Sequence, residues 1–257
     1  MTYMVTGEGF WRKPFFIILC TLFIVWIILF EFILPENNFL PKPDIVLLSV
    51  PALFDEYHLT ANFFTTLSAI YLPALLAYLF VFILRSFLLK RTTSIQIFTG
   101  FISKLSVFFP PFLLAVLFIF WFPGSLIIEY IFAFMISAIW WMIEIDSKAK
   151  YSNESYSLAF KSLGADDNFI NNNITWNEIK PGVFQNLGRF HLHFWAVILV
   201  FEYISNKYGL GSIMHQTLSY HDLSALFVVI IIIAAVISAG SRLLKFIENR
   251  FIFWSAE

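Results

Sequence analysis

The sequence predicts an all-α membrane protein with about six transmembrane helices, and three observations lead to this fold class. Hydrophobic residues make up 60% of the 257-residue chain, charged residues only 13%, and the mean hydropathy is +0.80. A soluble domain of this length has no interior large enough to hide so much apolar surface. The apolar residues also occur in runs of about twenty, the length that a helix needs to cross the hydrocarbon core. Lipid offers no partners to open backbone groups, so each run is expected to be helical.

Six apolar runs qualify as membrane spans. The first follows Arg12 and Lys13, is longer than the hydrophobic region of a signal peptide and lacks a small-residue cleavage site, so we expect a retained helix. The third carries Lys104 and the pair Pro110-Pro111, which removes two helical hydrogen-bond donors and predicts a kinked or broken span. The six runs cover residues 14–34, 60–84, 95–122, 125–145, 183–204 and 223–240.

The distribution of Lys and Arg predicts the orientation of these helices. With the N-terminus in the cytoplasm, twelve Lys and Arg residues fall on the cytoplasmic side and two fall outside. Cytoplasmic loops carry the excess of these residues, so both termini and the loop between the fourth and fifth runs are expected in the cytoplasm. The inner residues are Arg12, Lys13, Arg85, Lys90, Arg91, Lys148, Lys150, Lys161, Lys180, Arg242, Lys245 and Arg250, and the outer ones are Lys42 and Lys207.

The expected organisation is an N-terminal transmembrane helix with its outer loop over residues 1–59, followed by a core domain over residues 60–257. The net charge of −1 argues against a nucleic-acid partner. The only cysteine, Cys20, lies in an apolar run, and no disulfide can form within the chain.

A polar, helix-forming loop over residues 146–182 interrupts the otherwise apolar core domain. The sequence predicts one helix from Glu154 to Leu163, a left-handed stop at Gly164, and a second short helix through Asn171. The residues able to cap the two helices are Ser152 or Asn153 for the first and Asp166 or Asp167 for the second.

Apolar side chains on this polar loop allow two interpretations. Leu158, Phe160 and Leu163 would form a ridge that a partner protein could grip. Alternatively, the segment is an ordinary solvated loop that holds a small core of its own. The residues alone do not decide between the two.

Ionisable residues within the predicted spans are the second group of candidates, because charges in lipid are costly and tend to face water or protein. Glu202 either lines a path through the membrane or hydrogen-bonds to the loop that contains Gly209 and Gly211. Glu144 and Arg189 are expected to reach the inner interface with their charged ends. The whole group consists of Lys104, Glu129, Glu144, Arg189 and Glu202.

Polar residues of the fifth run are spaced along one helix face. Asn186, Arg189 and His193 would form a stripe that faces a pore or a second subunit. His191 and His193, two residues apart, point about 200° away from each other on a helix. They cannot share one ion without other helices, and no metal site is predicted.

Two blocks of the sequence match the pattern of a known family. The first corresponds to a cytoplasmic Glu-Ala-Ala motif followed by a glycine, a hydrophobic residue and two prolines. Leu158 stands at the motif glutamate, Phe160 at its second alanine, and Asn177 where the first proline is expected. The residues at the family spacing are Leu158, Ala159, Phe160, Gly164, Ile174 and Pro181.

The second block matches a pattern of Trp, Val, Ala-Glu and Gly-Leu-Gly without a gap, and Phe201 replaces the alanine. Before the core, Leu40-Pro41-Lys42-Pro43 is similar to a Leu-Pro-Ser-Pro sequence, and the basic tail from Arg242 to Trp254 is also similar. The residues of the second block are Trp195, Val200, Glu202, Gly209, Leu210 and Gly211.

With these blocks the chain resembles the permease subunits of binding-protein-dependent ABC importers, and it is most similar to the nitrate, sulfonate and taurine permeases. The resemblance runs from about Leu40 to Trp254 and is most specific between Leu163 and Gly211. It implies a type I importer fold in a bacterial cytoplasmic (inner) membrane, with loop 146–182 as the coupling loop. A small anion or small polar organic molecule is the implied solute.

The resemblance also implies roles for particular residues. The residues implied to couple to an ATPase are Leu158, Ala159, Phe160, Leu163, Gly164 and Ala165. Those expected along the translocation path are Glu202, Arg189 and His193.

The implied partners are an ABC ATPase dimer, a second permease copy, and a periplasmic or lipid-anchored solute-binding protein. The chain has no Gly-x-x-x-x-Gly-Lys loop to hold phosphates, so ATP would be bound by the partner subunit and no cofactor by this chain.

Two other functions are considered beside the importer permease. A degenerate subunit that anchors or regulates a transporter complex would explain the replaced motif residues, and also the bulky residues over 72–83 where the family places glycines that let helices approach. An intramembrane enzyme acting on lipid would need acid, base, nucleophile or metal ligands at one depth, and the sequence offers no convincing cluster.

Overall fold

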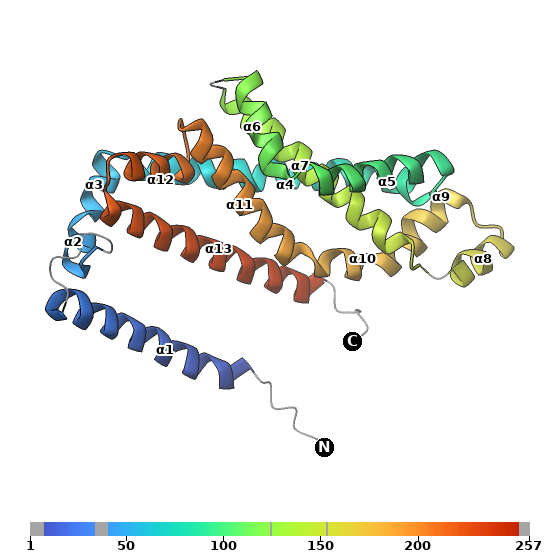
Figure 1. Cartoon of the computed structure of the whole chain (residues 1–257). Helices are drawn as coiled ribbons and strands as arrows, with labels where there is room; N and C mark the ends of the chain where they lie inside the picture. Colours follow the sequence, from blue (N-terminus) through green and yellow to red (C-terminus); the bar gives the residue numbers. More distant parts are fainter. Residues whose placement is uncertain (1–7, 34–40, 124, 153, 252–257) are drawn as a thin grey trace, which may run out of the picture.

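The computed structural model describes residues 8–33, 41–123, 125–152 and 154–251, and every regular element within these ranges is helical (Figure 1). Four of the described helices are long and apolar enough to cross a membrane. They are α4 (Leu59–Leu89), α7 (Leu126–Ala149), α11 (Leu187–Ser205) and α13 (Leu223–Phe251). The all-α membrane fold predicted from the sequence is confirmed.

The first predicted span is also helical. Helix α1 (Glu8–Ile28) continues into a π-helical turn, η1 (Leu29–Ile33), and Leu34 lies outside the described residues. Helix α1 runs beside α13 in Figure 1, and the rings of Trp26 and Phe227 are 5.2 Å apart. Two short helices, α2 (Pro43–Leu48) and α3 (Val50–Asp55), then lead into α4.

The third predicted span is broken at its double proline, as expected. Helix α5 (Thr93–Phe108) and helix α6 (Pro111–Trp121) meet at an angle of 86°. Pro110 and Pro111 lack the N–H groups that would continue the hydrogen-bond ladder. The two helices together form a fifth span only if this bent pair is counted as one.

The fifth span begins later than the sequence predicted. Residues 183–185 belong to helix α10 (Trp176–Gln185), and α11 starts only after Asn186. Because the α10 segment packs against the ends of other helices, its apolar residues Val183 and Phe184 are used for protein packing and not for a membrane crossing.

Two hydrophobic cores hold the helices together. One is centred on Trp195 and Phe132 and joins α4, α7 and α11 to α12 (Leu210–Ser219) and α13. The other is centred on Trp141 and Ile145 and joins α4, α5 and α7 to α10. Many large apolar side chains of α4, α5 and α6 remain exposed on the surface, which is the arrangement expected of helices that face lipid.

The molecule therefore has two distinct ends. At one end, which we call the elbow end, helix α8 (Glu154–Ser162), helix α9 (Asp167–Phe169), the π-helical segment η2 (Ile170–Thr175) and α10 project beyond the long helices (Figure 1). At the opposite, far end lie α2, α3 and the turn between α12 and α13.

A partly buried hydrogen bond closes the far end. The Tyr57 hydroxyl donates to Asp222 Oδ2 over 3.2 Å and so ties the end of α3 to the start of α13. Burial, and then the Asp222 carboxylate, raise the pKa of Tyr57 to about 12. At neutral pH the phenol is therefore protonated and remains a donor.

Candidate functional site

The turn between α8 and α9 has the hydrogen-bond pattern of a Schellman C-cap. The N–H of Ala165 donates to the carbonyl of Phe160 over 3.0 Å, and the N–H of Gly164 donates to that of Lys161 over 3.0 Å. Gly164 has a φ of +85°, in the left-handed region that this motif requires and that glycine adopts without strain. The left-handed stop predicted at Gly164 is confirmed.

The next helix starts immediately with a side-chain cap. Asp166 Oδ2 accepts from the N–H of Asn168 over 3.0 Å, as the sequence predicted for an N-cap. Across the turn, Lys161 Nζ and Asp167 Oδ1 form an ion pair of 2.8 Å. The hydrogen bond and charge of Lys161 hold the pKa of Asp167 below its usual value of 3.8. The two C-cap hydrogen bonds, the Asp166 cap and the ion pair of Lys161 with Asp167 thus fix the angle between the helices on either side of Gly164.

The second helix of this segment is not short, and the prediction that it ends at Asn171 is wrong. Residues 167–185 form one continuous rod through α9, η2 and α10, with Pro181 inside it. Ile170, Trp176 and Ile179 are buried at roughly helical spacing, and this packing outweighs the poor helix propensity of the three consecutive asparagines. We call α8, the Gly164 turn and this rod the elbow.

The rod packs on the long helices, whereas the α8 arm exposes large apolar side chains. Trp176 packs edge to face on Phe82 of α4, and Ser86 donates to Asn168 over 3.3 Å. On the arm, Leu158 is 63% exposed and Leu163 81% exposed. Of the predicted coupling residues, Ala159 and Gly164 are also exposed, whereas Phe160 and Ala165 are half-buried.

A second candidate region, the elbow-end cavity, lies where α7 passes the start of α11. It is open to the surface and has a volume of about 360 Å³. The predicted polar stripe of Asn186, Arg189 and His193 lines it, so these three residues do face one space. The complete lining consists of Trp140, Glu144, Asn186, Arg189, Phe190 and His193.

Glu144 is engaged by other side chains in this cavity. Asn186 Nδ2 donates to Glu144 Oε1 over 2.7 Å, and Lys148 Nζ lies 3.7 Å from the same oxygen. Glu144 is thus a paired carboxylate in the wall of this cavity, and its position at the inner interface stays a prediction. Arg189 is exposed and forms no ion pair within the described ranges.

The two histidines of α11 face different surroundings, as their spacing predicted. His191 is buried: Trp195 Nε1 donates to its Nε2 over 3.0 Å, and its Nδ1 lies 3.1 Å from Ser241 Oγ. Because Nε2 accepts, Nδ1 carries the proton and donates to Ser241. His193 is exposed, and its Nδ1 donates to the carbonyl of Arg189 over 2.8 Å. No group of three metal-ligating side chains occurs in the described residues.

Glu202 belongs to a dense cluster at the far end. Its Oε2 accepts from the N–H of Gly211 over 2.9 Å, and its Oε1 accepts from the Thr66 hydroxyl over 2.6 Å. The Thr66 oxygen in turn accepts from the N–H of Leu210 over 2.8 Å. Glu202 and Thr66 therefore satisfy N–H groups at the start of α12 that have no helical partner, and a carboxylate at a helix N-terminus is favourable. We call Thr66, Glu202, Gly209, Leu210 and Gly211 the far-end cluster.

The hydrogen bond between Glu202 and the Gly209–Gly211 loop, one of the two predicted roles of Glu202, is thus present. The side chain is 0% exposed and lines none of the cavities described above. Its role in a translocation path stays a prediction.

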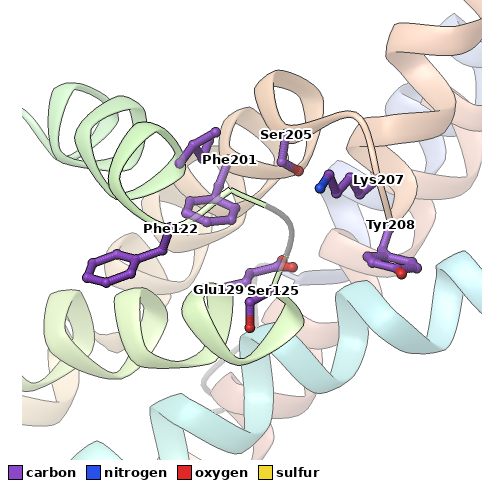
Figure 2. Close-up of a pocket in the computed structure, with 8 residues that line it drawn as sticks. Phe122, Ser125, Glu129, Phe201, Ser205, Lys207 and Tyr208 are labelled. Atoms are coloured by element: carbon purple, nitrogen blue, oxygen red, sulfur yellow. The ribbon is translucent and has the colours of Figure 1, made fainter.

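Beside this cluster is a much smaller, far-end cavity of about 20 Å³ (Figure 2). The Glu129 carboxyl and the Lys207 side chain enter it from different elements, α7 and the turn after α11. Glu129 is only 3% exposed, and its Oε1 has no hydrogen-bond partner among the described residues. Lys207, which the sequence placed in an outer loop, was not predicted to share a cavity with an intramembrane carboxyl.

Sequence reasoning missed the aromatic wall beside Arg189 and His193. The rings of Trp140 and Phe190 stack with centroids 4.2 Å apart, and those of Phe190 and Phe194 stack at 5.0 Å. Phe190 and Phe194 have the i, i+4 spacing of a helix face, which was a usable signal. Trp140 comes from another helix, and no local pattern indicates which residue it meets.

Comparison with known proteins gives one informative result. The family model described as "Binding-protein-dependent transport system inner membrane component" matches residues 89–253, which is more than half of the chain. The matched region contains the elbow, the elbow-end cavity and all of the far-end cluster except Thr66. Searches of curated proteins and of solved structures returned no match.

Proposed function

The chain belongs to the family of binding-protein-dependent transport system inner membrane components, and from this we propose that it is the permease subunit of an ATP-driven importer. In this proposal the elbow lies in the cytoplasm and fits a groove on a separate ABC ATPase. The elbow-end cavity is part of the path of a small solute, such as a nitrate-, sulfonate- or taurine-like anion or a small polar organic molecule.

One observation carries the proposal: the rod of the elbow leads directly into α11, the helix that lines the cavity. The exposed α8 arm is held at a fixed angle by the Gly164 turn, and the anchored rod leads through Asn186 directly into α11. Helix α11 then carries Arg189 and His193 at the cavity and Glu202 at the far end. A push on α8 would therefore move side chains of the cavity wall.

The energy for such a push comes from partners. A closing ATPase dimer with bound ATP would act on the elbow, because this chain has no phosphate-binding loop of its own. A second permease copy would complete the membrane path, and a periplasmic or lipid-anchored solute-binding protein would deliver the solute. The protein would reside in a bacterial cytoplasmic membrane with both termini inside.

Copurification tests this proposal. The chain is tagged, extracted from its native membrane in mild detergent, and the captured proteins are identified by mass spectrometry. An ABC ATPase and a solute-binding protein are expected, and recovery of the ATPase should fall when exposed Leu158 and Leu163 are both changed to Ser. Capture of neither partner from cells that express all components would refute the permease assignment.

The second candidate is a permease-like subunit that anchors or regulates the complex without moving solute. It is motivated by the replacement of the motif glutamate by Leu158, which is largely exposed on the arm. Deletion of this chain separates the two functions: loss of solute uptake supports the permease, whereas intact uptake with altered ATPase recruitment supports the regulatory subunit.

A further inference from the structure

The elbow-end cavity continues into a second cavity of different chemical character. This apolar cavity has a volume of about 160 Å³, lies between α7, α11 and the break between α5 and α6, and shares Trp140, Phe190 and His193 with the elbow-end cavity. The combined space has polar side chains at one end and an apolar wall along the rest. A site of this shape and size suits an organic molecule.

The apolar wall is built from stacked rings and branched aliphatic side chains. Trp140 and Phe190 lie nearly parallel, with an angle of 22° between their planes, and Phe190 and Phe194 lie at 19°. Ile136 and Ile139 of α7 extend this wall. Rigid aromatic surfaces favour flat apolar groups, which pack against them with little loss of conformational freedom.

The polar end carries an uncompensated positive charge. Glu144 is already bound by Asn186 and Lys148. Arg189 faces the same space and forms no ion pair within the described ranges, so its guanidinium group remains for an anion. His193 uses Nδ1 for the backbone of Arg189, and this leaves Nε2 as the ring nitrogen toward the cavity.

We propose that the two cavities together bind an organic anion that has a flat apolar body, with its carboxylate or other oxyanion group at Arg189 and its ring against Trp140. This substrate class rests on the proposed function. A small inorganic oxyanion such as nitrate would exchange its hydration for an apolar wall and a single guanidinium group, whereas an organic anion gains from burial of its ring.

Direct binding tests the class with three probes of different chemistry. The purified chain in lipid nanodiscs is titrated with benzoate, with benzyl alcohol and with nitrate, and the heat of binding is measured. Benzoate should bind at least about tenfold more tightly than the neutral benzyl alcohol, the ratio expected from one charge-assisted hydrogen-bonded pair. Nitrate should bind more weakly than benzoate by a similar factor.

Variants locate the binding site. Arg189→Gln should weaken benzoate binding about tenfold and leave benzyl alcohol unchanged, because only the anion uses the guanidinium group. Trp140→Leu should weaken both ring-bearing probes. Lys207→Gln removes an exposed cation at the far end and should leave all affinities unchanged. Equal affinities for benzoate and nitrate, or an unchanged benzoate affinity in Arg189→Gln, would overturn the proposal.

The cavity could instead be filled by a second copy of this chain. In that case benzoate would not bind, and Trp140→Leu would shift the dimer toward monomer in light scattering, which also overturns the proposal.

Failure of the substrate class is distinguishable from failure of the permease assignment. Recovery of an ATPase partner together with absent benzoate binding refutes only the class, whereas benzoate binding without any ATPase partner refutes only the transport role.

Discussion

Two glycines with similar positive φ values occupy opposite surroundings. Gly164 in the elbow has a φ of +85°, and Gly209 in the far-end cluster has a φ of +89°. A Cβ atom at Gly164 would meet nothing within 4 Å, whereas a Cβ at Gly209 would collide with the Glu202 carboxyl group. The elbow glycine is thus required by backbone shape alone, and the far-end glycine by shape and by close packing.

This difference indicates different roles for the elbow and the far-end cluster. The far-end cluster joins α4, α11 and α12 through buried hydrogen bonds, so changes there should damage the fold. The elbow holds its own angle through local contacts and exposes its α8 arm. Changes there should therefore leave the fold intact and affect partner binding or coupling.

The largest effect is expected from Glu202→Ala. Removal of the carboxylate leaves the buried N–H of Gly211 without its acceptor and opens a cavity. An orphaned group and a cavity together cost about 4 kcal/mol of the free energy of unfolding. Glu202→Gln keeps an oxygen for Gly211 and should cost less than about 1.5 kcal/mol. Thermal unfolding in detergent measures both, and similar melting temperatures for the two variants would contradict the proposed bonding.

The glycine pair gives the sharpest comparison. Left-handed backbone costs an alanine about 1–2 kcal/mol at position 164. At position 209 the ψ of 174° puts the backbone in an extended positive-φ region that is essentially restricted to glycine, where the cost is about 1–3 kcal/mol. Gly209→Ala must also displace Glu202, which adds about 1–3 kcal/mol for overpacking. Gly209→Ala should therefore lower the melting temperature clearly more than Gly164→Ala does. Equal losses at the two sites would show that the surroundings of the two glycines do not differ in the folded protein.

Gly164→Val should uncouple transport while the protein still inserts into the membrane. A β-branched residue is strained at a φ of +85°, so the Schellman turn would open and the α8 arm would lose its fixed angle. Solute uptake and solute-stimulated ATP hydrolysis are expected to fall at least about tenfold, the change that follows from loss of about 1.4 kcal/mol of coupling.

Gly164→Asn is the matched control, because asparagine tolerates the left-handed region. It should retain most of the uptake, with membrane levels equal to those of the Val variant. Normal uptake by Gly164→Val would refute the role of this turn in coupling.

Local sequence patterns predicted the features that depend on local chemistry. The break at Pro110-Pro111, the turn at Gly164 and the cap at Asp166 each follow from the properties of one or two residues, and each was predicted. The length of the elbow rod was not predicted, because Trp176 and Ile179 are stabilised by contacts with α4 and α7 that no local pattern reveals.

Long-range pairs account for what the sequence left open in the candidate site as well. The spacing of Asn186, Arg189 and His193 predicted a shared polar face, and the three residues do line one cavity. The hydrogen bond from Thr66 to Glu202, which lies 136 residues away, has no signal in the local sequence. The stacking of Trp140 on Phe190 likewise depends on the packing of α7 against α11.

The smallest effect is expected from the ion pair of the elbow. Lys161 lowers the pKa of Asp167, so the pair stabilises the turn at pH values above the usual value of 3.8, and this stabilisation is lost as the pH falls through the lowered pKa. Both side chains are exposed, and the global melting temperature at pH 7 should therefore not change in Asp167→Asn. Hydrogen exchange should become faster only at the amides around Asp166 to Ile170, and the wild type should show the same local loss at acidic pH. Faster exchange throughout α4 or α11 in this variant would mean that the elbow is not a separate unit of stability, and the contrast with the far-end cluster would fail.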